Sequence, residues 1–459
     1  MIRLALLSVL ILPLLFACNQ PDQQVSEEHR ERANQLIEAA MSDDSMVWER
    51  LAHLVDYYPH RLSGSQMLED AIDWTVEQMQ QDGFDDVRTQ EVQVPHWVRG
   101  DEYATLKTPI QKDMPMLGLG SSVGTGPDGI TAEVMVVRDF DELDARSEEA
   151  EGKIVLFNFE YETYGQAVQY RVRGADAAAQ YGAVAAIIRS VTDYSMQTPH
   201  TGNMRYSGEY PKIPIAAITV EDANLIHRFI DRGESVEVEL YMEAETLPDA
   251  TSRNIIAEIH GSEKPEEIIV IGGHIDSWDT GQGAMDDAGG CLVTWEALRI
   301  MAQQDRRPKR TIRLVLWTNE ENGVMGGRAY RDKVEESGEI DNHVLAFEVD
   351  FGVFEPLGYG FTGPESAMPT LKKIASLMEP VANMHVREGS SGTVDIGPLN
   401  RRGVPIMGLD VDVERYFWYH HSPADTIDVL DEEEVKKCTA SVAVMAWMVA
   451  DMESFIGGD

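Results

Sequence analysis

The segment Gly272–Gly290, which reads GGHIDSWDTGQGAMDDAGG, restricts the fold of this chain more than any other stretch. It holds one histidine, four aspartates and six glycines between the apolar run 268–271 and a helix-like apolar run that begins near Ala288. Each buried charge needs a partner and each glycine costs backbone entropy, so this composition would destabilise an ordinary core segment. We therefore interpret the segment as part of a metal site, whose remaining ligands must come from elsewhere in the chain.

The length and charge of the chain exclude several classes of protein. With 459 residues, 43% of them hydrophobic, the chain can form two or three domains of about 100 to 200 residues each. Its formal net charge of −41 would repel the phosphates of nucleic acid and an anionic lipid surface. We therefore expect a multidomain protein that binds no nucleic acid.

The N-terminus predicts export. Residues 1–18 contain Arg3 and then the apolar run Leu4–Phe16, which is too short for a membrane-spanning helix and is typical of a signal peptide. Leu15–Cys18 (LFAC) resembles a bacterial lipobox, so we expect a lipid anchor at Cys18 and a periplasmic or outer-membrane location; the alternative is an ordinary cleaved signal. The polar, glutamine-rich residues 19–30 suit a tether.

Two further blocks precede the glycine-rich segment. Residues 31–114 contain helix-like runs and a strand-like run at Val87–Val94, and we expect them to begin an α/β domain. Residues 115–247 differ, because short apolar strands (GKIVLFNF, AVAAIIRS and IPIAAIT) are separated and followed by helix-like runs, as in a domain of its own. This order of strands resembles the protease-associated domain; the alternative is that the block continues the α/β core.

Residues 248–459 alternate strands with helices, which predicts an α/β fold with a mainly parallel central sheet flanked by helices. Such sheets bind ligands at the carboxyl ends of their strands. The polar residues of interest follow strand-like runs and so are expected at one edge of the sheet: His274, Asp286, Glu320, Glu321, Asp350 and His421. Imidazole and carboxylate ligands that converge from separate strands predict a two-metal hydrolytic centre, and zinc suits this ligand set.

The motifs also resemble a known family. The runs HID (274–276), MDD (285–287), NEE (319–321), Asp350 and HSPAD (421–425) are similar, in order and spacing, to the di-zinc exopeptidases of the leucyl aminopeptidase and glutamate carboxypeptidase family. HIDSWDTGQGAMDDAGG and YFWYHHSPADT are most similar to its plasma glutamate carboxypeptidase branch. The resemblance covers nearly all of the expected mature chain and implies the zinc-dependent exopeptidase fold with an inserted protease-associated domain.

The resemblance implies a role for each residue. Asp286 would bridge two Zn²⁺ ions and form a cis peptide bond with Asp287. His274 and Asp350 would complete one zinc site, and Glu321 and His421 the other. Asp276 would accept the free imidazole N–H of His274. Glu320 would act as the general base that takes a proton from the water between the ions and delivers it to the leaving amine.

Three assignments stay open at this point. Many relatives carry tyrosine before the zinc histidine, where this chain has His420; we expect His420 to donate to the oxyanion, and a purely structural role is the alternative. His420 and His421 could exchange roles, and the HSPAD match favours His421. Glu348 is the rival of Asp350, which the pattern E-x-D-x-G favours.

The resulting hypothesis is an exported zinc exopeptidase that acts on short peptides and forms a homodimer. Overall resemblance favours carboxypeptidase or dipeptidase action, and a zinc aminopeptidase is the alternative. A non-catalytic receptor on this fold should lack ligands, whereas this chain keeps all five. An acyl-transfer cyclase on this fold would resemble the single-zinc relatives, so two bound zinc equivalents would argue against it.

Overall fold

The computed structural model describes residues 25–390 and 392–453. The signal peptide and the lipobox expected over 1–18 lie outside the described residues. Residues 27–30, which we expected in a tether, instead form the first turn of helix α1 (Glu27–Met41), because Ser26 accepts the backbone N–H of His29 and caps the helix. Within the described part of the chain, no helix combines the length and apolarity that spanning a membrane requires.

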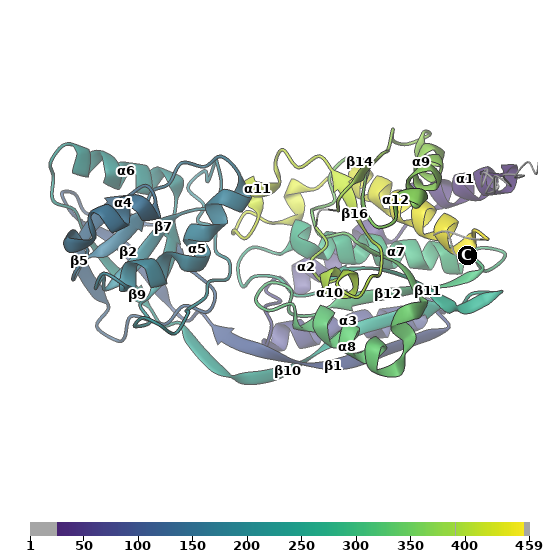
Figure 1. Cartoon of the computed structure of the whole chain (residues 1–459), viewed down its shortest axis with the longest axis horizontal. Helices are drawn as coiled ribbons and strands as arrows, with labels where there is room; N and C mark the ends of the chain where they lie inside the picture. Colours follow the sequence, from purple (N-terminus) through teal and green to yellow (C-terminus); the bar gives the residue numbers. More distant parts are fainter. Residues whose placement is uncertain (1–24, 391, 454–459) are drawn as a thin grey trace, which may run out of the picture.

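The described chain forms two lobes, each built on its own eight-stranded sheet (Figure 1). The first sheet has a parallel centre, β12–β11–β13–β16, which confirms the predicted fold class. Antiparallel neighbours extend it on both sides. In spatial order its strands are β1 (Asp86–Val98), β10 (Glu245–Ile259), β12 (Arg310–Trp317), β11 (Lys264–His274), β13 (His343–Glu348), β16 (Ile406–Val411), β14 (Pro356–Thr362) and β15 (His385–Glu388).

The first sheet is buried on both faces, because side chains alternate along each strand. Ile269 and Ile271 of β11 pack into the larger core, whereas Ile268 and Val270 pack into a smaller core on the opposite face. The larger core is covered by α1, α2 (Val47–Tyr57), α3 (Gln66–Gln81), α7 (Gly289–Ala302), α9 (Met368–Ala375) and α12 (Glu432–Asp451). The smaller core is covered by α8 (Met325–Ser337) and α10 (Gly397–Asn400).

The second sheet lies in a separate lobe, which we call the insert (residues 102–242). Its strands, in spatial order, are β3 (Lys112–Met114), β2 (Glu102–Thr108), β9 (Glu237–Met242), β5 (Ile130–Val137), β6 (Ile154–Phe157), β7 (Ala185–Arg189), β8 (Ile215–Ile218) and β4 (Met116–Gly118). Its helices are α4 (Phe140–Ala145), α5 (Tyr164–Ala179) and α6 (Val220–Asp231). The sequence suggested that the insert starts at residue 115. Strands β2 and β3 precede that residue and belong to the second sheet, so we infer that the insert begins with β2.

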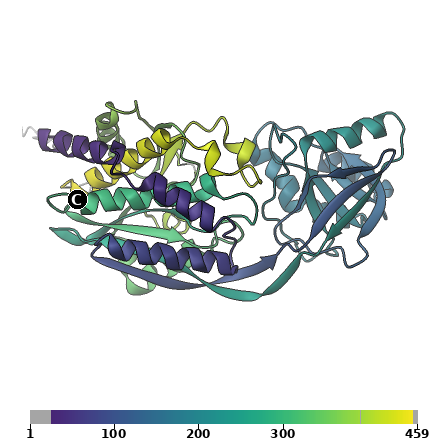
Figure 2. The ribbon, with the colours of Figure 1, turned by 180° about the vertical axis from the view of Figure 1, so that it is seen from behind.

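A long two-stranded ribbon joins the lobes. Strands β1 and β10 pair antiparallel from Asp86 with Glu258 to Val98 with Glu245, so that β1 runs from the first lobe toward the insert and β10 runs back (Figures 1 and 2). A second contact is made by Trp278, which belongs to the glycine-rich segment but packs into a core cluster of the insert and is 2% exposed. Arg99 also forms a two-point ion pair with Asp279 of that segment. The insert is therefore docked against the segment that the sequence singled out.

Candidate metal centre

The parallel centre of the first sheet places the predicted ligands at one edge. His274 is the last residue of β11, Glu321 follows β12, and Asp350 follows β13. These three strands are neighbours and run in the same direction, so their carboxyl ends lie together. His420 and His421 arrive from another part of the chain, directly after the short helix α11 (Tyr416–Tyr419).

Glycine is required where the segment 272–290 turns beneath the ligands. Gly283 has a φ of 57°, in the left-handed region that glycine adopts without strain. At Gly290, a Cβ atom would lie 2.0 Å from the carbonyl oxygen of Val349 and 2.3 Å from Oδ1 of Asp287. Gly290, at the start of α7, therefore lets the backbone lie close to Val349 and Asp287. The peptide bond between Asp286 and Asp287 is cis, as expected.

The carboxylate of Asp286 divides the site into two halves. Its Oδ1 atom lies 3.3 Å from Nε2 of His274, and that nitrogen lies 3.2 Å from Oδ1 of Asp350. Its Oδ2 atom lies 3.3 Å from Nε2 of His421, and that nitrogen lies 3.0 Å from Oε2 of Glu321. The structure thus brings all five predicted ligands together, with one oxygen of Asp286 directed to each half.

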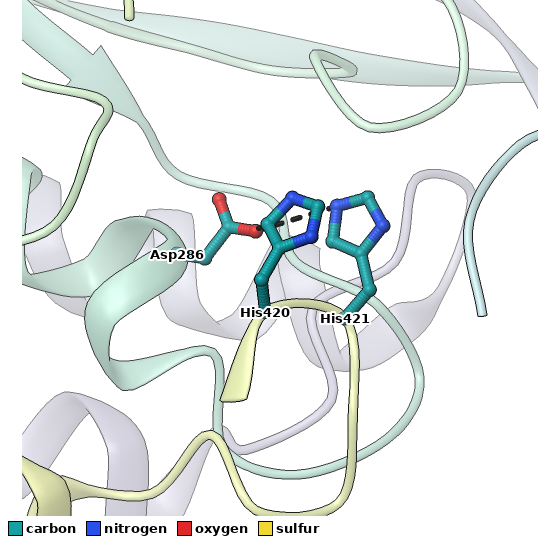
Figure 3. Close-up of side chains that lie close together, drawn as sticks. All are labelled: Asp286, His420 and His421. Atoms are coloured by element: carbon teal, nitrogen blue, oxygen red, sulfur yellow. Dashed lines mark ion pairs between the residues drawn. The ribbon is translucent and has the colours of Figure 1, made fainter. Parts of the chain in front are cut away.

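His420 lies beside His421 at the same carboxylate (Figure 3). The two rings stack with centroids 3.6 Å apart, and Nε2 of His420 lies 3.5 Å from Oδ2 of Asp286. His421 differs in having the additional approach to Glu321. This difference supports His421 as the ligand in the second half and leaves His420 facing the cavity.

The donor set fits zinc. Oδ2 of Asp286 and Oε1 of Glu321 are buried without a hydrogen-bond partner in the described structure, which is costly for a carboxylate unless a cation binds it. Asp286 belongs to two groups of potential ligands, one with His274 and Glu321 and one with His420 and His421. Within each group the ligand atoms lie within 4.8 Å of one another. Imidazole nitrogens and carboxylate oxygens are ligands that zinc accepts.

The pKa values of several site residues are shifted, because their ionisable groups are buried close to one another. Burial, and next the charge of Asp286, raise the pKa of Glu321 well above its usual range. Burial also raises the pKa of Asp350, although His274 acts in the opposite direction. Burial lowers the pKa of His420 well below its ordinary value, and the neighbouring His421 adds to this effect, so the imidazole of His420 is neutral. Bound cations would favour the ionised carboxylates.

Two neighbouring aspartates hold the backbone around the site. The carboxylate of Asp287 accepts the backbone N–H groups of His274 and Gly290, so it supports the backbone of the site. The same carboxylate also lies near His274 and Asp350. Asp276 contacts His274 through its main chain. Nδ1 of His274 lies 2.9 Å from the backbone carbonyl of Asp276, whereas the carboxylate of Asp276 is 3.7 Å away.

That carboxylate has a different set of partners. It accepts backbone N–H groups of Glu320 and Glu321 at 3.0 and 3.3 Å, and the hydroxyl of Ser63 at 3.3 Å. Asp276 therefore orients His274 through its main chain and the two glutamates through its side chain.

Glu320 lies at the cavity and outside the two ligand clusters. Its side chain is half-buried and lines a cavity of about 240 Å³ together with Asp286, Glu321 and Asp350. Burial is the main cause that raises the pKa of Glu320 well above its usual range, and the charges of Asp350 and Glu321 add to it. A carboxylate that holds a proton readily beside a cluster of candidate metal ligands is suited to acid–base chemistry.

The sequence did not reveal two residues of the insert that line this cavity and a third that contacts the main chain of His420. Tyr164 and Arg171 on α5 line it, and an N–H nitrogen of Arg171 lies 3.3 Å from Nδ1 of His421. Nδ1 of His200 lies 2.7 Å from the carbonyl oxygen of His420. Their contacts arise from docking of the insert, and no local motif marks them.

Arg61 and the loop 388–398 differ in their relation to the cavity. Arg61 is fully buried and donates to the carbonyl oxygens of Ile275, Gln282 and Gly283, so it braces the glycine-rich segment and does not face the cavity. The loop 388–398 does reach the cavity, which Gly392 and Val394 line. Among the described cysteines, Cys291 and Cys438 are buried free thiols.

Comparison with known proteins agrees with the geometry. A model of peptidase family M28 matches residues 254–446, and a PA domain model matches residues 121–226. Human carboxypeptidase Q is 46% identical over 409 residues, which cover 89% of this chain and 86% of the human protein. Bovine carboxypeptidase Q is 44% identical over 447 residues, which cover 95% of this chain and 94% of the bovine protein.

Solved structures have the same architecture. A peptidase M28 precursor from Shewanella amazonensis superposes with a TM-score of 0.89 at 33% identity, covering 93% of this chain and 98% of its own. A zinc aminopeptidase from Bacillus subtilis has a TM-score of 0.67 at 21% identity, covering 92% of this chain and 98% of its own, and shares the fold. Similarity at this level over nearly the whole length shows that the chain belongs to peptidase family M28 and carries a PA domain within the peptidase fold.

Proposed function

We propose that this protein is a di-zinc exopeptidase that hydrolyses dipeptides or short peptides with free termini. The observation that carries the proposal is the position of Asp286, whose two carboxylate oxygens face separate sets of ligand atoms. In the proposed site, His274 and Asp350 would hold one ion, Glu321 and His421 would hold the other, and Asp286 would serve as a ligand to both. Membership of a peptidase family and the zinc aminopeptidase of the same fold support zinc as the metal.

The residues around the site then have defined tasks. A zinc pair polarises the scissile carbonyl and lowers the pKa of water. Glu320 takes the proton of the attacking water and passes it to the leaving amine, as its place at the cavity and its readiness to hold a proton allow. His420 is neutral and lines the cavity, so its N–H is available to donate to the oxyanion of the tetrahedral intermediate.

Arg171 favours a carboxypeptidase or dipeptidase over an aminopeptidase. It is the one lysine or arginine among the described residues that line the cavity, and its Nε atom is buried without a hydrogen-bond partner there. Carboxylates bind guanidinium groups through charge-assisted hydrogen bonds, so this group suits the free carboxylate of a short peptide. The names of the carboxypeptidase Q relatives agree with this choice, and a zinc aminopeptidase remains the second candidate because an aminopeptidase shares the fold.

We further propose that the protein is exported through its N-terminal signal, anchored by a lipid at Cys18, and dimeric. The support for export and for the anchor is the apolar run 4–16, whose last two residues begin the sequence LFAC (15–18). Replacing Cys18 by serine should move the protein from the membrane fraction to the soluble fraction. Light scattering of the protein without its signal tests the dimer, which a monomer mass would contradict.

A panel of substrates tests the proposed function. Free dipeptides should be hydrolysed, C-amidated versions should react much more slowly, and N-blocked versions with a free carboxylate should keep part of the rate. Chelator should abolish hydrolysis, and zinc should restore it with two equivalents bound per chain. Hydrolysis of C-amidated but not N-blocked peptides would support the aminopeptidase instead. One zinc equivalent, or no peptide hydrolysis with zinc present, would overturn the proposal.

A further inference from the structure

The insert touches the main chain of the two adjacent histidines at the metal site. Nδ1 of His200 lies 2.7 Å from the carbonyl oxygen of His420, and the backbone N–H of Thr201 donates to the carbonyl oxygen of His421 at 2.8 Å. A carbonyl oxygen can only accept, so Nδ1 of His200 carries the proton. Two consecutive residues of the insert thus hold two consecutive carbonyl groups of the other lobe.

His200 is itself anchored to the sheet of the insert. Its side chain is 2% exposed, and its backbone N–H donates to the hydroxyl of Ser190 at 2.9 Å. That hydroxyl donates to the carbonyl oxygen of Ile218, at the end of β8, at 2.8 Å. A chain of hydrogen bonds therefore runs from the second sheet through Ser190 and His200 to His420.

The segment that carries His420 and His421 depends on such support. It follows the four-residue helix α11, and His421 has a φ of 59°, in the left-handed region that non-glycine residues rarely adopt. Surrounding contacts must hold this conformation. The insert supplies the two carbonyl contacts, and Trp278, which packs into the core of the insert, lies with its ring centroid 5.6 Å from that of His421.

We propose that His200 is a positioning residue through which the docked insert holds His421 in its half of the metal centre. The inference rests on the proposed zinc site. It implies that zinc bound by Glu321 and His421 is held less tightly when the contact from His200 is lost, whereas zinc bound by His274 and Asp350 is unaffected. The insert would then contribute to assembling the metal site.

Three variants of the full chain test this role. His200→Leu removes the N–H donor and keeps the apolar volume, whereas His200→Asn can place an amide donor near the position of Nδ1. His227→Leu is the control, because His227 is a half-buried histidine of α6 in the same insert and contacts Asn158. Bound zinc is measured after dialysis against graded chelator, and kcat and KM are measured at limiting and saturating zinc.

In His200→Leu, one of the two zinc equivalents should leave at a roughly 10- to 100-fold lower chelator concentration, as is typical when a partner of a ligand is lost. Saturating zinc should restore most of kcat, and His200→Asn should behave more like the parent. The control should match the parent throughout. Equal weakening of both zinc equivalents, or no change in either, would overturn the proposal.

Hydrogen exchange gives a readout that is independent of metal and activity. Peptides that cover residues 416–425 should exchange faster in His200→Leu than in the parent, with little change over β11. If His200→Leu does not fold, Ser190→Ala removes the acceptor for the backbone of His200 and should give the same pattern at smaller amplitude. Unchanged exchange over 416–425 in a folded variant would contradict the inference. A parent that binds no zinc or cleaves no peptide would instead contradict the proposed function.

Discussion

Nε2 of His421 lies 3.0 Å from Oε2 of Glu321. His420, its neighbour in the chain, reaches Asp286 at 3.5 Å but has no ion pair with Glu321 in the described structure. Adjacent histidines with stacked rings therefore face the site differently. The approach to a second carboxylate distinguishes the proposed ligand from the proposed oxyanion donor.

The two histidines should respond differently to substitution. His421→Ala should remove about one zinc equivalent per chain and lower kcat/KM by more than about 100-fold, because a ligand itself is lost. His420→Ala should keep the zinc and lower kcat by about 100- to 1,000-fold, as for the loss of one oxyanion donor. Metal analysis and steady-state kinetics check both. Loss of zinc from His420→Ala alone would exchange the two assignments.

Glu320→Gln should separate metal binding from catalysis. The amide keeps the shape of the side chain but cannot take a proton, so kcat should fall by about 100- to 10,000-fold while zinc content stays at the parent value. Glu336→Gln, at an exposed position on α8, is the matched control and should keep the parent rate. A Glu320→Gln variant with near-parent kcat would show that another group moves the proton.

The residues at the edge of the central sheet could be predicted, because each follows an apolar strand that is visible in the local sequence. His274 follows a buried apolar strand, and Asp350 lies just beyond another. Parallel strands bring their carboxyl ends together, so order along the chain was enough to place these residues at one site. Glu320 lines the cavity beside the proposed ligands.

Contacts made by docking of the lobes could not be predicted in this way. Arg171 is 250 positions from His421 in the sequence, and neither residue lies in a pattern that points to the other. The carbonyl of Asp276 holds His274 in place of the carboxylate, a choice that depends on how the chain bends after β11. We also infer that the insert begins earlier than its composition suggests, because β2 pairs with β9, far along the chain, and β3 pairs with β2.

Arg171→Gln should raise KM selectively for substrates with a free carboxylate. Loss of one charge-assisted hydrogen bond should raise KM for these substrates by about 10- to 100-fold. The KM for C-amidated peptides should be nearly unchanged. Arg173→Gln is the control, because Arg173 lies on the same helix but is exposed and contacts the ring of Phe140. Zinc content should be measured in parallel, since Arg171 also approaches His421. An equal loss for free and amidated peptides would remove Arg171 from substrate recognition.

The stability of the first lobe should depend on the buried histidine His343. Its Nδ1–H donates to the carbonyl of Glu339, its Nε2 accepts from the hydroxyl of Tyr330, and burial lowers its pKa to about 4. The unfolded chain binds this proton near pH 6.5. The stabilisation is therefore complete above about pH 6.5 and is lost as the pH falls toward 4, by about 3 kcal/mol in total.

The variant His343→Gln isolates this contribution, because glutamine does not titrate. Urea unfolding of parent and variant at pH 8, 6 and 4.5 gives the difference in unfolding free energy at each pH. The parent should be the more stable at pH 8, and its advantage should shrink as the pH falls, since only the parent must exclude a proton from His343 in the folded state. His60→Gln, at an exposed histidine, is the control. A difference between His343→Gln and the parent that is constant from pH 8 to pH 4.5 would show that His343 is not the residue whose burial resists protonation.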